Sequence, residues 1–213
     1  MIAIACAAVL FDMDGVLVDS SPAIEASWRQ WAERRGLPVE TVLGLIHGRT
    51  APEVIRQVAP HLSVEAEWRT LIRQEMEAEA IHVFAGAAAL LRAIAPARRA
   101  VVTSAPRQIA QARLARIAAP APGALVCAED VAAGKPAPEG FLRAAAALGV
   151  APADCVVVED SAPGLAAARA AGMRAIGVAT TRPFETLEAD WRIRALSRLR
   201  ARTTPDGVVL EIA

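Results

Sequence analysis

From residue 84 onward, the sequence alternates short apolar runs with alanine-rich segments. The apolar runs predict strands, and the segments between them predict helices because their apolar residues recur at helical spacing. In chain order we expect helix 86–95 and strand 99–104, helix 107–117 and strand 124–130, helix 138–148 and strand 154–160, and helix 162–171 and strand 174–180. Strands that alternate with helices in this way favour a parallel, doubly wound sheet with helices on both faces. The ligand crevice of such a sheet lies at the carboxyl ends of its strands.

Both ends of the chain also predict strands. The N-terminal run MIAIACAAVLF predicts the first strand of the same sheet. It lacks the basic region of a secretory signal peptide and runs directly into Asp12. The C-terminal segment LRARTTPDGVVLEIA has a PDG turn between two strand-like runs, which predicts a terminal hairpin.

Residues 20–82 differ from the rest because they have helical patterns almost throughout. The segment SPAIEASWRQWAERRG, for example, starts with serine and proline and ends in glycine, which are helix start and stop signals. We therefore expect a Rossmann-like core from residues 1–17 and 84–213. A small helical domain, residues 18–83, is inserted directly after the first strand and is expected to sit over the crevice.

The first strand leads into FDMDGVLVDSS, in which Asp12 and Asp14 stand one residue apart before Gly15. Carboxylates beside a core are costly unless something pairs with them. Two interpretations are open for this motif taken alone. The carboxylates form a solvated turn, or they hold a metal ion together with a phosphate.

Polar residues follow the other predicted core strands as well. Thr103 and Ser104 end the second strand, Glu159 and Asp160 end the fourth, and a Gly-Lys-Pro turn with Lys135 follows the third. Because parallel strands end at one edge of a sheet, we expect these side chains on one rim with the two aspartates of the first motif. Each signal is weak alone, but their combination favours a binding site.

Lys135 stands out because it is the only lysine among 23 basic residues. Lysine is a compact point charge on a thin stem, whereas arginine is a wide planar fork. A crowded anionic pocket can accept the first and exclude the second. The sequence therefore favours a chemical reason for lysine at this position over chance.

Composition excludes several classes of partner. The formal net charge is zero and 54% of residues are hydrophobic, which offers no basic surface for nucleic acid and no polybasic membrane tether. The three cysteines, Cys6, Cys127 and Cys155, lie in separate apolar runs without a CxxC pair. This favours reduced thiols in a cytoplasmic protein. Nothing in the sequence marks a dimer surface, so the oligomeric state stays open and a monomer is assumed.

Together, these motifs resemble the four motifs of the haloacid dehalogenase (HAD) superfamily. The DxDGV run, the strand-terminal threonine, the lysine before proline and the Glu-Asp pair each match one motif, over nearly the whole chain. The helical insert resembles the small helical cap of the first type. The IHGRT and VVVEDSAPG stretches are most similar to bacterial sugar phosphatases, with the β-phosphoglucomutase branch a near neighbour. The resemblance implies an HAD fold and Mg²⁺-dependent hydrolysis of a small phosphorylated metabolite, a sugar or polyol phosphate.

The resemblance implies a catalytic role for each motif. Asp12 is the implied nucleophile, which forms an aspartyl-phosphate. Asp14 is the implied acid/base, which protonates the leaving oxygen and then deprotonates water. Lys135 would offset the charge of Asp12 and the phosphate. The Thr103 hydroxyl and the Ser104 amide would hold phosphoryl oxygens.

The same resemblance implies a Mg²⁺ site built from oxygen ligands. Asp12 and Asp160 are the implied carboxylate ligands. Asp14 is implied to bind through its backbone carbonyl, and Glu159 is either a ligand or a neighbour of one.

Side chains of the helical insert help to distinguish the phosphatases, mutases and phosphonatases of this superfamily. By the resemblance His47 and Arg49 face the substrate, although a surface turn is the alternative for these two. The mutases typically carry a histidine where this chain has Ile24, and they use a basic cap residue, often lysine, where only arginine is available. A phosphonatase needs a cap lysine, which is absent. We therefore expect a phosphatase, with a β-phosphoglucomutase-like phosphomutase as the alternative.

Other classes fit less well. A dehalogenase does not need a carboxylate at Asp14. Receiver domains of signalling proteins also use aspartyl-phosphate, but they are shorter and lack a cap insert. A non-catalytic phospho-acceptor or interaction protein is the lower alternative, because every implied catalytic residue is present.

Overall fold

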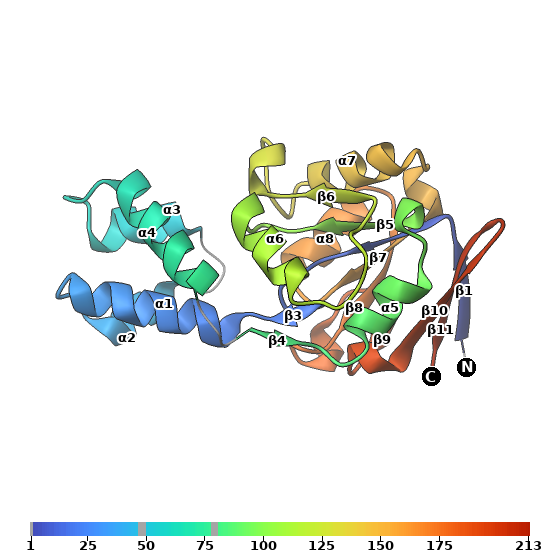
Figure 1. The fold of residues 1–213 in the computed structure, drawn as a ribbon, viewed down its shortest axis with the longest axis horizontal. Coiled ribbons are helices and arrows are strands. Elements are labelled where there is room, and N and C mark those ends of the chain that lie inside the picture. Colours follow the sequence, from blue (N-terminus) through green and yellow to red (C-terminus); the bar gives the residue numbers. More distant parts are fainter. Residues whose placement is uncertain (1, 47–49, 78–80) are drawn as a thin grey trace. The chain divides into compact units, whose positions relative to one another are not determined.

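The computed structural model describes residues 2–46, 50–77 and 81–213. The chain forms two compact units, one of Met1–Asp19 with His82–Ala213 and the other of Ser20–Ile81 (Figure 1). The expected insert, residues 18–83, is two residues wider at each end than the second unit. The reason is that β3 (Val18–Asp19) and β4 (His82–Val83) pair with each other antiparallel and belong to the first unit.

The first unit is built on a six-stranded parallel sheet. From one edge to the other its strands are β6 (Ala124–Val126), β5 (Arg99–Val102), β2 (Ala8–Phe11), β7 (Cys155–Glu159), β8 (Arg174–Val178) and β9 (Trp191–Ile193). The three central strands β5, β2 and β7 are mostly apolar and are buried along their whole length, as expected for a sheet covered on both faces. The expected parallel, doubly wound fold is confirmed.

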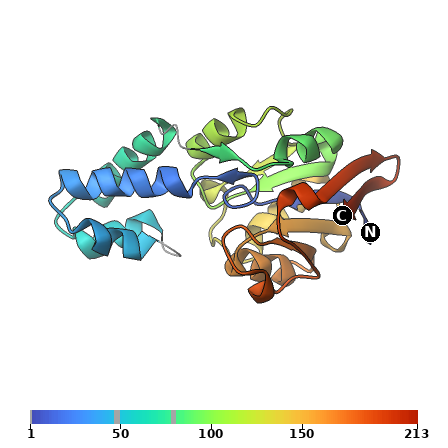
Figure 2. The ribbon, with the colours of Figure 1, turned by 90° about the horizontal axis from the view of Figure 1, so that it is seen from below.

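Helices cover both faces of this sheet. Figure 2 shows α5 (Ala87–Ala93) and α6 (Arg107–Ala115) on one face and α8 (Ala162–Ala170) on the other. The helix α7 (Glu139–Leu148) packs with α8, and both contribute to one core cluster that includes Phe141 and Leu165. Short 3-10 helices connect the larger elements at Pro96–Arg98, Ala128–Asp130, Pro152–Asp154, Phe184–Thr186 and Leu196–Arg198.

The prediction of one continuous N-terminal strand was wrong. The run forms β1 (Ile2–Cys6) and β2, which belong to different sheets. The terminal hairpin of β10 (Leu199–Thr204) and β11 (Gly207–Ile212) is confirmed, and it takes β1 as a third, antiparallel strand. The break falls at Ala7, whose amide donates to the carbonyl of Asp154 at 2.7 Å.

Two smaller strand predictions also needed correction. The strand expected at 124–130 ends at Val126, because the Cys127 amide donates to the Asp130 carboxylate at 2.8 Å and turns the chain into a 3-10 helix. The edge strand β9 was not expected. Its three residues include the exposed Arg192, so it lacks the apolar run that identified the other strands.

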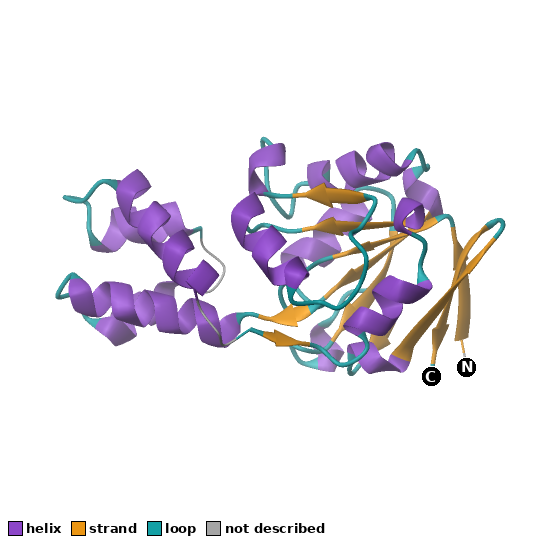
Figure 3. Ribbon diagram, in the orientation of Figure 1, coloured by secondary structure: helices purple, strands orange, loops and turns teal. Residues whose placement is uncertain are grey.

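In the described residues, the second unit contains four helices (Figure 3). They are α1 (Ser21–Arg34), α2 (Val39–Ile46), α3 (Ala51–Val58) and α4 (Val64–Glu77). Trp28 and Trp31 are buried in its core and meet edge to face at 5.3 Å between ring centroids. The Trp31 indole donates to the buried Glu67 at 2.7 Å, and Arg35 pairs with both oxygens of the same carboxylate. This unit therefore has a hydrophobic core of its own.

No helix in the described parts of the chain is long and apolar enough to span a membrane.

Candidate active site

The carboxyl ends of three neighbouring strands place the predicted residues together. Phe11, the last residue of β2, lies opposite Val101 of β5 and Val158 of β7. Each strand therefore ends at the same level of the sheet, and Asp12 continues the pairing by donating its amide to the Val158 carbonyl at 2.9 Å. The sheet register, rather than any local sequence, brings the separate motifs to one rim.

Lys135 links the motifs at this rim. Its Nζ donates to Asp12 Oδ1 at 2.6 Å, to Glu159 Oε2 at 3.0 Å and to the Val102 carbonyl at 3.4 Å. Only 12% of the side chain is exposed. Burial alone would lower the pKa of Lys135, but the two adjacent carboxylates raise it above its usual value. The lysine is therefore a permanent cation facing Asp12.

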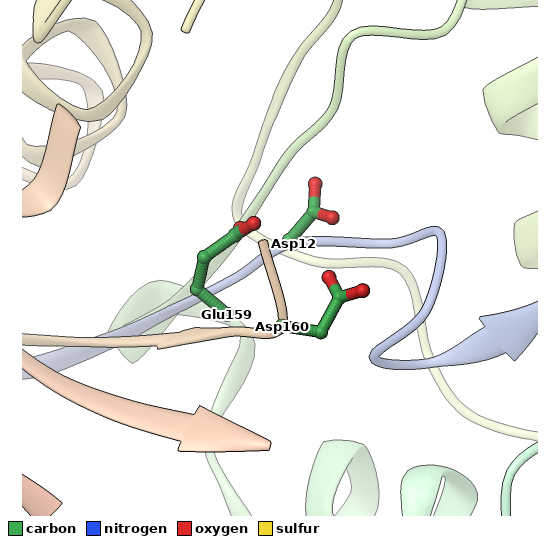
Figure 4. A group of neighbouring side chains, drawn as sticks. All are labelled: Asp12, Glu159 and Asp160. Atoms are coloured by element: carbon green, nitrogen blue, oxygen red, sulfur yellow. The ribbon is translucent and has the colours of Figure 1, made fainter. Parts of the chain in front are cut away.

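Asp12, Glu159 and Asp160 form a buried acidic group (Figure 4). One carboxylate oxygen from each lies within 4.8 Å of the others. Burial, followed by the charge of Glu159, raises the pKa of Asp12 well above its usual value and that of Asp160 to about 7. The group contains three carboxylates, and Lys135 donates to two of them. One positive charge therefore faces three acidic groups.

The chemistry of this group fits a divalent cation. Asp160 Oδ1 is buried and has no hydrogen-bond partner among the described residues. A buried oxygen without a partner is costly. Hard divalent cations such as Mg²⁺ prefer carboxylate oxygens, and an ion would supply both the missing charge and the missing partner.

Residues beyond the predicted set orient the acidic group. The hydroxyl of Thr181 donates to Asp160 Oδ2, and that of Thr180 donates to the backbone carbonyl of Gly15. The amide of Ser161 donates to Glu159 Oε1 at 3.2 Å, and its hydroxyl donates to the same oxygen. Both threonines follow β8, the one core strand whose end was not considered in the sequence, although it carries a visible Thr-Thr pair.

Two glycines allow the acidic group to pack closely. Gly15 has φ of +83°, and a Cβ there would lie 2.2 Å from Asp160 Oδ2. At Gly164, in the first turn of α8, a Cβ would lie 2.1 Å from the carboxyl carbon of Glu159. The second glycine supports the site although it is not a predicted site residue.

Gly164→Ala should displace the Glu159 carboxylate and so disturb its contact with Lys135. Overpacking of this kind typically costs about 1–3 kcal/mol of the free energy of unfolding. Urea denaturation measures the loss. Gly44→Ala is the matched control, because nothing lies within 4 Å of a Cβ built there in the interior of α2. Equal stability of the two variants would show that the Glu159 side chain can shift away from the added methyl group without a cost in stability.

Asp14 lies apart from the acidic group. Its Oδ1 accepts a hydrogen bond at 2.6 Å from Nη1 of Arg113, and its Oδ2 accepts one at 3.4 Å from the Thr103 hydroxyl. Arg113 was not predicted. Its signal in the sequence is a charged residue on the apolar stripe of α6, four residues after Ile109, where both side chains are buried.

The other predicted site residues are Thr103, Ser104, His47 and Arg49, and the structure describes only the first two. Thr103 is buried at the rim, and its hydroxyl also accepts from the Ala105 amide at 3.0 Å. Ser104 is exposed next to it. His47 and Arg49 lie outside the described residues.

The arrangement can perform a definite kind of chemistry. Asp12 offers a carboxylate oxygen beside a fixed ammonium, and the acidic group can hold a cation. A second carboxylate, Asp14, lies two residues away with 28% of its side chain exposed. This combination suits nucleophilic attack on an anionic group whose charge a cation and a lysine offset.

Comparisons with known proteins agree with this geometry. A family model described as a haloacid dehalogenase-like hydrolase matches residues 6–172. Hexitol phosphatase A of Escherichia coli (strain K12) is 40% identical over 212 residues, which cover 96% of this chain and 98% of that protein. Validoxylamine A 7'-phosphate phosphatase of Streptomyces hygroscopicus subsp. limoneus is 35% identical, over 90% of this chain and 94% of that one.

A solved structure shares the fold. The crystal structure of CbbY from Rhodobacter sphaeroides in complex with phosphate has a TM-score of 0.75 at 24% identity. The match covers 90% of this chain and 95% of that chain.

Proposed function

The chain belongs to the haloacid dehalogenase-like hydrolase family, and from this premise we propose that it is a phosphatase for small phosphate monoesters of sugars or polyols. The observation that carries the proposal is the buried Asp12 carboxylate, held at 2.6 Å by the only lysine and grouped with two further carboxylates. The substrate class is supported by the names of the two relatives, a hexitol phosphatase and a phosphatase of validoxylamine A 7'-phosphate.

The proposed reaction has two steps. In the first, an Asp12 oxygen attacks phosphorus, the bond from phosphorus to the sugar oxygen breaks, and Asp14 donates a proton to the departing oxygen. In the second, water attacks the aspartyl-phosphate while Asp14 takes up a proton from it. Inorganic phosphate leaves and the Asp12 carboxylate is restored. Lys135 offsets the negative charge in both steps, and Thr103 and Ser104 are proposed to hold phosphoryl oxygens.

We propose Mg²⁺ as the cofactor, with Asp12, Asp160 and the backbone carbonyl of Asp14 as ligands and Glu159 as a ligand or a neighbour of one. When bound, the ion would offset the charge of the phosphoryl group and of the carboxylates around it. His47 and Arg49 stay candidates for substrate contacts from the helical insert.

Phosphate release from a panel of hexitol, hexose, pentose and glycerol phosphates tests the proposed function. Release with Mg²⁺ from at least one polyol or sugar phosphate is the expected result, and the rates rank the substrates. The phosphomutase alternative predicts no release but isomerisation of a β-linked glucose phosphate in the presence of a sugar bisphosphate. Inactivity in both assays would overturn the enzymatic proposal.

Removal of the metal should stop turnover, and Asp160→Asn should weaken metal binding directly. We expect EDTA to abolish phosphate release and added Mg²⁺ to restore it. Calorimetric titration of the purified protein with MgCl₂ should show an affinity at least about 10- to 100-fold lower for Asp160→Asn, because a carboxylate ligand is lost. Asp154→Asn, an exposed carboxylate before β7, is the matched control. Equal Mg²⁺ affinity of Asp160→Asn and wild type would exclude Asp160 as a ligand.

A further inference from the structure

Arg113 is an arginine buried inside the first unit. It lies on α6 on the same buried stripe as Ile109, and only 5% of its side chain is exposed. A charged group is costly to bury unless it is paired with another charge. The partner here is Asp14, whose Oδ1 lies 2.6 Å from Arg113 Nη1.

The Asp14 carboxylate is held at both oxygens. Arg113 binds Oδ1 and the Thr103 hydroxyl binds Oδ2. Both contacts come from the core: Thr103 follows β5, and Arg113 lies on the helix that begins a few residues later. The carboxylate is therefore oriented by residues of the sheet and helix layer, apart from the acidic group of Asp12, Glu159 and Asp160.

We propose that Arg113 is a positioning residue that fixes the direction of the Asp14 carboxylate for proton transfer. The inference rests on the proposed function, because it takes Asp14 as the group that donates a proton to the departing sugar oxygen. A general acid acts only within hydrogen-bonding reach of the atom that it protonates. A carboxylate that rotates freely spends little time there, and the advantage of fixed orientation is lost.

Substrates with different leaving groups distinguish a positioning role of Arg113 from a purely structural one. A sugar or polyol oxygen departs as a strongly basic alkoxide and needs the proton. The p-nitrophenolate anion is stable at neutral pH and departs without one. The value of kcat/KM reports only the first step, in which the leaving group departs, so the later use of Asp14 with water does not affect it.

The experiment compares kcat/KM for a hexitol phosphate and for p-nitrophenyl phosphate in Arg113→Met, Arg113→Lys and wild type. We expect Arg113→Met to lower kcat/KM about 100-fold for the hexitol phosphate, within the range of general acid catalysis, and by less than about threefold for the aryl ester. Arg113→Lys should recover part of the loss, because an ammonium is also a charged donor that can pair with Asp14 Oδ1. Arg116→Met, exposed at the end of the same helix, should match wild type.

Equal losses for the two esters would show that Arg113 is structural, and no loss for either would show that Asp14 needs no anchor. Either result overturns the inference. Inactivity of the wild type on both esters would instead overturn the proposed function. In that case a crystal structure of Arg113→Met decides the positioning role independently. An Asp14 carboxylate that is displaced or occupies two conformers supports the positioning role, and an unchanged carboxylate overturns it.

Discussion

Asp12→Asn should abolish turnover without unfolding the protein. The amide that replaces the carboxylate is a poor nucleophile, so no aspartyl-phosphate forms. Removal of a nucleophile typically costs about 10⁴-fold or more in kcat. Phosphate release from the best substrate of the panel, in the presence of Mg²⁺, measures the loss. Asp154→Asn serves as the control for an aspartate outside the site.

The stability of the same variant distinguishes a catalytic loss from a structural one. Burial and the charge of Glu159 raise the pKa of Asp12, which means that its ionised form is unfavourable in the metal-free protein. A neutral amide of the same shape avoids that repulsion, as at many active sites that trade stability for function. We therefore expect the thermal midpoint of metal-free Asp12→Asn to be no lower than that of wild type. A lower midpoint together with partial activity would contradict the assignment of Asp12 as nucleophile.

The parallel sheet could be predicted from the sequence because each core strand is a short apolar run that ends in a recognisable turn. Val156, Val157 and Val158 illustrate this, since all three are fully buried. The division of the N-terminal run between two sheets could not be predicted in the same way. The N-terminal run is apolar on both sides of Ala7, so hydrophobicity alone does not reveal that the terminal hairpin captures only its first part.

The acidic group and Lys135 were predictable for a related reason. Charged residues at the ends of buried strands, or in the loops that follow them, are rare enough to be noticed, and the parallel topology gives them a common rim. Thr181 and Arg113 were missed because each acts through a carboxylate on another element, Asp160 or Asp14. A threonine after a strand and an arginine in a helix have no distinctive pattern until the sheet register shows what they face.

Lys135→Arg should cripple the enzyme although the positive charge is kept. The ammonium lies between Asp12 Oδ1, Glu159 Oε2 and the Val102 carbonyl, all within 3.4 Å, and next to the face of Phe141 at 5.3 Å from the ring centroid. A planar guanidinium is wider than an ammonium and cannot occupy this position without displacing the carboxylates. Misplacement of a reacting group by about 1 Å can cost about 100-fold in rate.

We therefore expect kcat of Lys135→Arg to fall at least ~100-fold, and that of Lys135→Met to fall further because the charge is lost as well. Steady-state kinetics with the best substrate of the panel measure both. Arg143→Lys, at an exposed salt bridge on α7, is the reverse exchange at a site without crowding and should leave kcat unchanged. Near-normal activity of Lys135→Arg would mean that charge alone is required at this position. The presence of lysine there, in a chain whose other basic residues are all arginine, would then have no steric cause.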